Sequence, residues 1–171
     1  MKYLSLVLIT FLCLNTLNAQ DLSKKEKKEA AKVEAYNDLK SLIESNNYRF
    51  IAEWSMPTGS ARRNLMTTPN SLDYDGSEMD VMLPYFGSSQ TVNTYNHDSM
   101  GIEFKGKPEK YNIKYDDDKR EIEITFQGKY SSESLNFKFV IKGTSARLYV
   151  NSSGRNSISY DGKISELKKA E

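Results

Sequence analysis

The fold of this chain is decided by residues 78–87, which read Glu-Met-Asp-Val-Met-Leu-Pro-Tyr-Phe-Gly. Every second residue from Met79 to Leu83 is apolar, and this period of two predicts a strand with one buried face. Pro84 lacks a backbone donor and fixes φ, so strand pairing is expected to end there. Gly87 is expected to adopt a backbone angle that other residues resist. The stretch therefore predicts a strand and a rigid aromatic corner at the centre of a β-rich domain.

The rest of the chain contains short segments in which apolar and polar residues alternate between turn signals. Asp75-Gly76 and Asp161-Gly162 are dipeptides that favour tight hairpin turns, and Asp116-Asp117-Asp118 predicts another turn. No helical segments separate the strands, as a parallel α/β sheet would require. We expect a mainly β fold, an antiparallel meander forming a barrel-like or strongly curved sheet, with a sandwich as the alternative. The segments are Tyr48–Trp54, Arg62–Thr67, Leu72–Tyr74, Ile102–Phe104, Tyr111–Tyr115, Ile122–Phe126, Leu135–Ile141, Ala146–Val150, Ile158–Tyr160 and Lys163–Leu167.

Residues 1–19 have the composition of a signal peptide. Lys2 precedes an apolar run, Leu4–Leu14, that is too short to span a bilayer, and Ala19 offers a small residue before a cleavage site. Cys13, the single cysteine, lies in this segment, and the large residue before it argues against a lipoprotein signal. Cleavage near Ala19 would leave a mature chain without disulfides, thiol chemistry or a transmembrane span. We expect a periplasmic or secreted protein.

A charged segment, residues 20–29, comes next, and a single β-rich domain with a leading helix is predicted for residues 30–171. Ser23 and Glu26 have capping-box spacing, although the charged residues around them are expected to fray in water. Asn46-Asn47 is expected to end the helix, because asparagine tolerates the left-handed conformation. An apolar stripe predicts an amphipathic helix that packs on its own domain, with a membrane or a partner as the alternative. The stripe consists of Val33, Tyr36, Leu39, Leu42 and Ile43.

The charge of the chain is balanced, with 24 Lys and Arg, 23 Asp and Glu, and a net charge of +1. A nucleic-acid-binding domain is expected to carry a basic excess gathered on one face. The run at Lys24–Lys28 is interrupted by Glu26, so it is not such a patch. The composition therefore argues against nucleic acid as a partner.

Three motifs carry a family resemblance. They are Leu83-Pro84-Tyr85-Phe86-Gly87, then Gly101-Ile102-Glu103-Phe104, and near the end Ala146-Arg147-Leu148-Tyr149-Val150 with Arg155 and Ile158-Ser159-Tyr160-Asp161-Gly162. With these motifs the chain resembles the secreted bacterial proteins of domain-of-unknown-function family 4251, from roughly Ala30 to the end. The resemblance implies a secreted, mainly β domain that follows a signal peptide. It implies no reaction, and no catalytic residue is carried over from it.

No constellation of residues predicts a recognisable catalytic or metal centre. His97 is the only histidine, and the chain has neither a Gly-x-Ser-x-Gly elbow nor a second histidine for zinc. The carboxylates of Asp73–Asp80 could offer oxygen ligands to calcium, but strand alternation and a turn explain them without a metal. Asp116–Asp118 is typical of a solvated turn. We expect no catalytic residue, metal or cofactor, and a hydrolase centred on His97 is the least favoured function.

Tyrosine is the most informative part of the composition, with eleven residues, several on the apolar side of predicted strands. A buried tyrosine needs a partner for its hydroxyl. One interpretation is a concave ligand site with aromatic walls, and the other is a core whose tyrosines reach solvent at its rim. Arg155 follows a Gly/Ser turn and would hold an anionic ligand or form a surface ion pair. The candidate ligand-binding residues are Trp54, Tyr74, Tyr85, Phe86, Tyr111, Tyr115, Tyr160 and Arg155.

The function favoured by the sequence is non-enzymatic binding of a small or extended ligand by an exported protein. The alternative is a structural or protein-interaction module of the cell envelope, which would use a sheet edge or the charged helix. Asp98-Ser99-Met100 resembles a short bacterial O-glycosylation acceptor, so Ser99 is a candidate for modification in a polar loop.

Overall fold

The computed structural model describes residues 23–87, 101–130 and 133–168, which contain one helix and ten strands. His97 and Ser99 lie outside these residues, as does the predicted signal peptide, residues 1–19. The helix is α2 (Lys24–Glu44), and it is not apolar enough to cross a membrane. The strands are β1 (Tyr48–Pro57), β2 (Arg63–Asn64), β3 (Ser71–Tyr74), β4 (Met79–Pro84), β5 (Gly101–Gly106), β6 (Glu109–Asp116), β7 (Glu121–Tyr130), β8 (Glu133–Lys142), β9 (Ser145–Ser152) and β10 (Ile158–Glu166).

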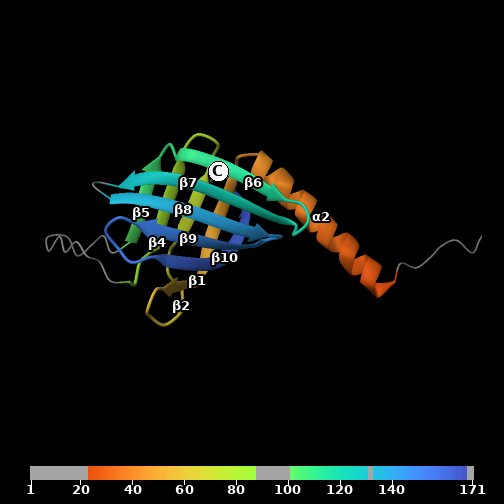
Figure 1. The fold of residues 1–171 in the computed structure, drawn as a ribbon, viewed down its shortest axis with the longest axis horizontal. Helices are drawn as coiled ribbons and strands as arrows, with labels where there is room; N and C mark the ends of the chain where they lie inside the picture. Colours follow the sequence, from red (N-terminus) through yellow and green to blue (C-terminus); the bar gives the residue numbers. More distant parts are fainter. Residues whose placement is uncertain (1–22, 88–100, 131–132, 169–171) are drawn as a thin grey trace, which may run out of the picture. The chain divides into compact units, whose positions relative to one another are not determined.

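The strands form one antiparallel sheet in the order β5-β4-β3-β1-β10-β9-β8-β7-β6, with β2 paired to β1. The sheet curls into a half-barrel, so that β6 to β10 cross in front of β1, β4 and β5 in Figure 1. β1 joins the two halves because it pairs with β3 on one side and with β10 on the other. The prediction of a mainly β, strongly curved antiparallel sheet is confirmed.

One aromatic and aliphatic core fills the concave side of the sheet, and it is built by residues from both halves. Phe50 of β1 packs edge to face on Phe139 of β8, with ring centroids 5.1 Å apart. Phe104 of β5 lies 6.4 Å from Phe137 of β8, which stacks on Phe126 at 4.5 Å. These side chains are almost fully buried. Since each buried side chain of this size contributes about 1.5–3 kcal/mol, the contacts between the halves hold the sheet in its curled form.

The opening stretch behaves largely as its sequence predicts. Met79, Val81 and Leu83 are buried, and β4 ends at Pro84. β3 and β4 form the predicted hairpin, with Tyr74 opposite Met79. The connection contains four residues rather than two, because the Asp75 carboxylate accepts hydrogen bonds from the backbone of Ser77 and Glu78 and from the Ser77 hydroxyl. These bonds lower the pKa of Asp75 to about 2.

The predicted hairpin turn at Asp161-Gly162 is wrong. β10 runs through both residues without a break, with Asp161 opposite Trp54 and Gly162 opposite Ala52. A Cβ atom at Gly162 would collide with the carbonyl oxygen of Ile51 and lie 2.8 Å from the Cα of Ala52. The glycine is therefore needed for close approach of two backbones inside the sheet, which a sequence pattern does not separate from a turn.

A β-bulge at the same place corrects a second prediction. The register of β1 against β10 shifts between Ala52 and Trp54, so the alternation of the strand changes phase there. Ser55 is consequently fully buried, and among the described residues its hydroxyl has no hydrogen-bond partner. Trp54, expected on the buried face, is half-buried on the outer face instead.

The capping box predicted for the helix is present. The Glu26 carboxylate accepts from the Ser23 amide at 2.7 Å, and the Glu26 amide donates to the Ser23 hydroxyl at 3.3 Å. Asn46 follows the helix with φ at 53°, as expected for its left-handed end. Tyr36, Leu39 and Ile43 join the core of residues 33–168, and Leu42 packs against it, but Val33 is exposed. The described residues before Val33 are helical and belong to a separate unit, and their fraying in water stays a prediction.

Replacing Gly162 with alanine is expected to destabilise the protein by about 2 kcal/mol or more, because the new methyl group collides with β1 backbone rather than with a movable side chain. Urea denaturation of G162A and the wild type measures the difference. S165A, at an exposed position of the same strand, is the control and is expected to stay within about 0.5 kcal/mol. Wild-type stability of G162A would contradict the close approach.

Candidate functional site

The structure does not gather the eight predicted ligand-binding residues at one site. Tyr74 and Tyr111 meet at one end of the core, whereas Tyr85, Tyr160 and Arg155 meet beside the aromatic corner. The other three, Trp54, Phe86 and Tyr115, each contact a cation at a different place. The contacts of each group decide whether it could receive a ligand.

Tyr74 and Tyr111 belong to a cluster of three tyrosines with Tyr48. Tyr74 stacks on Tyr111 at 5.1 Å and contacts Tyr48 at 5.4 Å, and the hydroxyls of Tyr48 and Tyr111 share a hydrogen bond of 3.3 Å. The Tyr74 hydroxyl donates to the Gly76 carbonyl at 3.3 Å. Burial raises the pKa of Tyr111 to about 12 and that of Tyr48 well above its ordinary value. All three hydroxyls are thus occupied within the protein.

Tyr85 and Tyr160 tie the aromatic corner to the last strand. The Tyr160 hydroxyl donates to the Pro84 carbonyl at 2.9 Å, and the Tyr85 hydroxyl donates to the Asn156 carbonyl at 3.0 Å. Pro84 ends the strand and also supplies the carbonyl that accepts this hydrogen bond. Tyr160 is fully buried, so its hydroxyl needs an acceptor within the protein. These two bonds join the segment Leu83-Pro84-Tyr85-Phe86-Gly87 to the residues from Asn156 to Tyr160.

The predicted reason for Gly87 is wrong. Its φ lies outside the left-handed region, so no special backbone angle requires a glycine there. A Cβ atom at this position would instead meet the Tyr85 ring, with the ring carbon Cζ 2.6 Å away. The glycine makes room for the tyrosine that closes the corner.

Arg155 forms a buried ion pair and does not present a free guanidinium. Its Nε and Nη2 donate to one oxygen of Glu133 at 3.1 and 2.9 Å, and its Nη1 donates to the Gly101 carbonyl at 2.5 Å. The side chains of Arg155 and Glu133 are each only 14% exposed. The Ser152 hydroxyl donates to the other Glu133 oxygen, and the guanidinium lies 5.4 Å from the Tyr85 ring centre. The arginine joins β5, β8 and β9, which favours a structural role over anion binding.

The remaining candidates each contact a basic side chain, and Phe86 also packs against the core. Arg62 stacks on Trp54 with its guanidinium carbon 4.0 Å from the ring centre, and Arg63 covers Phe86 in the same way at 4.7 Å. Tyr115 is exposed near Lys40, which donates at 2.5 Å to Asp117, a residue of the β6–β7 turn that also accepts from Tyr36. The tyrosine-lined core therefore corresponds to the second interpretation of the sequence, a packed interior with tyrosines at its rim.

The acidic segments are engaged in the same kind of local contact. Asp73 pairs with Arg49 at 2.6 Å and Asp80 with Lys105 at 2.7 Å, while Asp75 closes its turn. Among the residues that the structure describes, no three His, Cys, Asp or Glu side chains converge to hold a metal ion.

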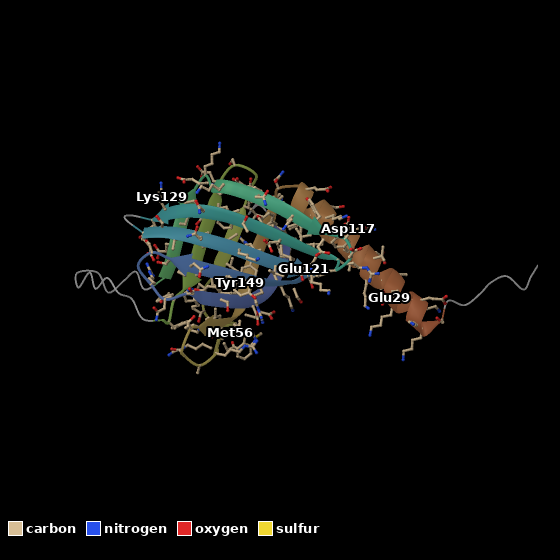
Figure 2. The ribbon with its side chains drawn as sticks, viewed as in Figure 1. Glu29, Met56, Asp117, Glu121, Lys129 and Tyr149 are labelled. Carbon is tan, nitrogen blue, oxygen red and sulfur yellow. The ribbon has the colours of Figure 1, made fainter. Side chains whose placement is uncertain are left out.

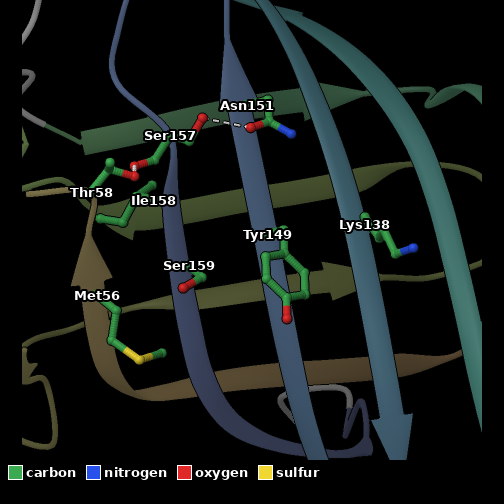
Figure 3. Close-up of a pocket in the computed structure, with 8 residues that line it drawn as sticks. All are labelled: Met56, Thr58, Lys138, Tyr149, Asn151, Ser157, Ile158 and Ser159. Atoms are coloured by element: carbon green, nitrogen blue, oxygen red, sulfur yellow. Dashed lines mark hydrogen bonds between the residues drawn. The ribbon is translucent and has the colours of Figure 1, made fainter.

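The strongest candidate site is a groove of about 540 Å³ on the outer face of the sheet. It crosses the end of β1, β10, β9 and β8, and Figure 2 shows Tyr149 and Met56 on this face. We call it the outer groove. Its lining combines one exposed aromatic ring and two apolar side chains with hydroxyl, amide and ammonium groups (Figure 3). The lining residues are Met56, Thr58, Lys138, Tyr149, Asn151, Ser157, Ile158 and Ser159.

Strand register explains why these side chains converge. Met56 lies opposite Ser159, Ser159 opposite Tyr149, and Tyr149 opposite Lys138, so the four form a row across four strands. The bulge in β1 is what turns Met56 outward into this row. The outer groove is not predictable from the sequence, because outward polar residues look like ordinary solvated surface. The one available signal was Tyr149, an aromatic residue at an outward position of its strand.

The charged groups beside the outer groove are already paired. Lys138 lies 2.7 Å from Glu123, and Arg147 contacts Asp161 with two hydrogen bonds of 2.6 and 3.0 Å. The pKa of Arg147 is raised above its ordinary value, mainly by its hydrogen bonds to Asp161 and to a smaller extent by the Tyr149 hydroxyl. The groove therefore presents polar groups without an unpaired charge on Lys138 or Arg147.

Replacing Arg155 with alanine is expected to lower the free energy of unfolding by about 2–3 kcal/mol, because Glu133 keeps a largely buried charge without its partner. K105A is the control, since it removes an exposed partner of Asp80 and is expected to cost less than about 1 kcal/mol. Chemical denaturation measures both. Equal losses in the two variants would contradict a structural role for Arg155.

The raised pKa of Tyr111 predicts alkaline sensitivity. The folded state keeps the phenol neutral to about pH 12, whereas the unfolded chain releases the proton from its ordinary pKa of 10.0. This contribution to stability is complete below pH 10 and is lost as the pH rises through 12. The free energy of unfolding is therefore expected to fall over this interval, and less steeply in Y111F. Identical slopes for the two proteins would contradict the burial of this hydroxyl.

Comparison with known proteins agrees with the fold. No protein of curated function matches the sequence. A crystallised DUF4251 family protein from Bacteroides eggerthii DSM 20697 has a similar fold, with a TM-score of 0.60 and 15% identity over 80% of this chain and 91% of that one. A family model described as a domain of unknown function (DUF4251) matches residues 30–164, most of the chain. The chain therefore belongs to the DUF4251 family, as its sequence motifs predicted.

Proposed function

We propose that this protein is an exported, non-catalytic binding module whose ligand occupies the outer groove. The observation that carries the proposal is the row of side chains from Met56 to Lys138, which lines a hollow of about 540 Å³ on the outer face of the sheet. A hollow of this size lies within the range of small-molecule sites. Export after cleavage near Ala19 is part of the proposal and rests on the composition of residues 1–19.

The packing of the core supports the outer groove over a site inside the half-barrel. Tyr48 and Tyr160 are fully buried, and their hydroxyls bond to Tyr111 and to the Pro84 carbonyl. A ligand that entered between the halves would have to break these bonds and separate rings such as Phe50 and Phe139. Both steps cost free energy that a surface site does not require.

The envelope-interaction alternative has one supporting observation, the position of β6 at the end of the sheet. An end strand can pair with an extended segment of a partner. The register of β6 shifts between Glu109 and Asn112, and Lys110 adopts a φ of 51°. Irregularity and lysine both discourage edge pairing, so β6 is a weaker candidate than the outer groove.

The test is to fill the outer groove and follow ligand binding by the fluorescence of Trp54, the single tryptophan, which lies two residues from Met56 on the outer face of β1. Ser159→Arg places a long side chain in the groove, and Ser165→Arg adds the same side chain at an exposed position of the same strand. With libraries of saccharides and amphipathic molecules, we expect a fluorescence response in the wild type and in S165R, and at least about a tenfold weaker affinity in S159R.

Two outcomes would count against the proposal. The first is the absence of any response across the libraries, together with an identified protein partner after crosslinking in cells. The second is equal binding by S159R and S165R, which would place the ligand elsewhere on the molecule.

A further inference from the structure

We infer that the ligand of the outer groove is an uncharged, extended carbohydrate that lies across β10, β9, β8 and β7. The inference deepens the proposed function and rests on it. Three properties of the face carry it: a flat aromatic ring, a neighbouring row of amides and hydroxyls, and the internal pairing of the charges.

Tyr149 supplies the flat surface. Its side chain is 38% exposed, and Figure 3 shows the ring broadside, lying along β9 rather than standing out into solvent. Ser159 of β10 and Lys138 of β8 lie opposite Tyr149 on the two neighbouring strands, so the ring has a side chain on each side. A ring held flat on a sheet can stack against the apolar C–H face of a sugar at a low cost in side-chain entropy.

Amide and hydroxyl groups lie beside the ring in register. Asn151 of β9 is opposite Asn136 of β8, which is opposite Gln127 of β7. We call these three residues the amide row. Asn151 accepts a hydrogen bond of 2.6 Å from Ser157 (Figure 3), and the Gln127 amide donates to Asn136 at 2.6 Å. Side-chain amides both donate and accept, which is the chemistry that sugar hydroxyls require.

The spacing of these groups favours an extended ligand. Neighbouring strands lie about 4.8 Å apart, so a chain that crosses them meets a new polar side chain at each strand. Tyr149 stands next to Asn151 on the same face of β9, and Lys138 and Asn136 stand beside them on β8. A linear saccharide could therefore stack one unit on the ring while the next units bond to the amide row.

The charge arrangement favours a neutral ligand over an anionic one. Glu123 holds Lys138 at 2.7 Å, and Asp161 holds Arg147 in a two-bond pair. An anionic ligand would have to compete with these two carboxylates for Lys138 and Arg147. A cationic ligand would have to compete with the same two basic side chains for the carboxylates. A neutral polyol needs neither exchange.

The test uses neutral linear oligosaccharides of glucose, xylose, mannose and N-acetylglucosamine, titrated by calorimetry into the intact mature protein. Y149A is expected to weaken binding about tenfold or more, while Y149F keeps the ring and stays within about threefold of the wild type. N136A and Q127A are each expected to lose about tenfold when the oligosaccharide is long, and less when it is short. Y130A, which removes another exposed tyrosine that lies outside the groove, is the control and is expected to bind normally.

The outcomes separate this inference from the proposed function. If an amphipathic or charged ligand binds in the groove and S159R blocks it, while no neutral oligosaccharide binds, the carbohydrate inference fails and the binding function stands. If oligosaccharides bind equally to Y149A and the wild type, the assignment of the groove as the saccharide site fails. If nothing binds at the groove, both fail.

Discussion

Packing between the two halves of the half-barrel is the constraint on which the rest of the structure depends. Phe50 on Phe139 and Phe104 on Phe137 join strands that lie apart in the sheet order, and these contacts hold the sheet in its curled form. The space they share is filled to van der Waals contact, as the Cβ of an alanine at Gly128 would lie 2.8 Å from the Phe104 ring. Close packing of this kind leaves little freedom to open the interior for a ligand.

The buried tyrosines add a requirement for hydrogen-bond partners inside the packed core. A hydroxyl carried into the core must find an acceptor there, and Tyr160 finds the Pro84 carbonyl while Tyr48 finds Tyr111. The charge of Arg155 is satisfied in the same way, because Glu133 and the Gly101 carbonyl accept its hydrogen bonds. The tyrosines and the arginine that suggest a ligand site in the sequence therefore stabilise the fold. The binding that we propose uses the outer face, where Tyr149 and the amide row are not part of the buried core.

Much of the fold was predictable, because alternation of apolar residues reports directly which face of a strand is buried. β4, β8 and β9 follow that rule, and β7 follows it as far as Gly128. The predicted alternation is wrong at β1, because the bulge before Trp54 changes which face each later side chain occupies. The predicted turn at Gly162 is wrong because the Asp-Gly dipeptide is typical of hairpin turns, whereas this glycine permits two strands to approach closely. Both errors have one origin, since bulge and glycine face each other across the same strand pair.

The candidate site was less predictable than the fold. Tyr85, Tyr160 and Arg155 are candidates for ligand contact in the sequence, with packing or an ion pair as the alternative, because a residue type does not reveal whether its hydrogen bonds are taken up by the backbone. The outer groove depends on register across four strands, and register is a property of pairing that a single sequence does not display.

The described interior is packed, and we propose that binding takes place on the outer face. NMR of side-chain signals during titration with the neutral oligosaccharides distinguishes the two locations. We expect shifts of the Tyr149 ring and the Met56 methyl group, with the rings of Tyr48 and Tyr160 unchanged. Shifts of Tyr48 and Tyr160 with Tyr149 unmoved would contradict it.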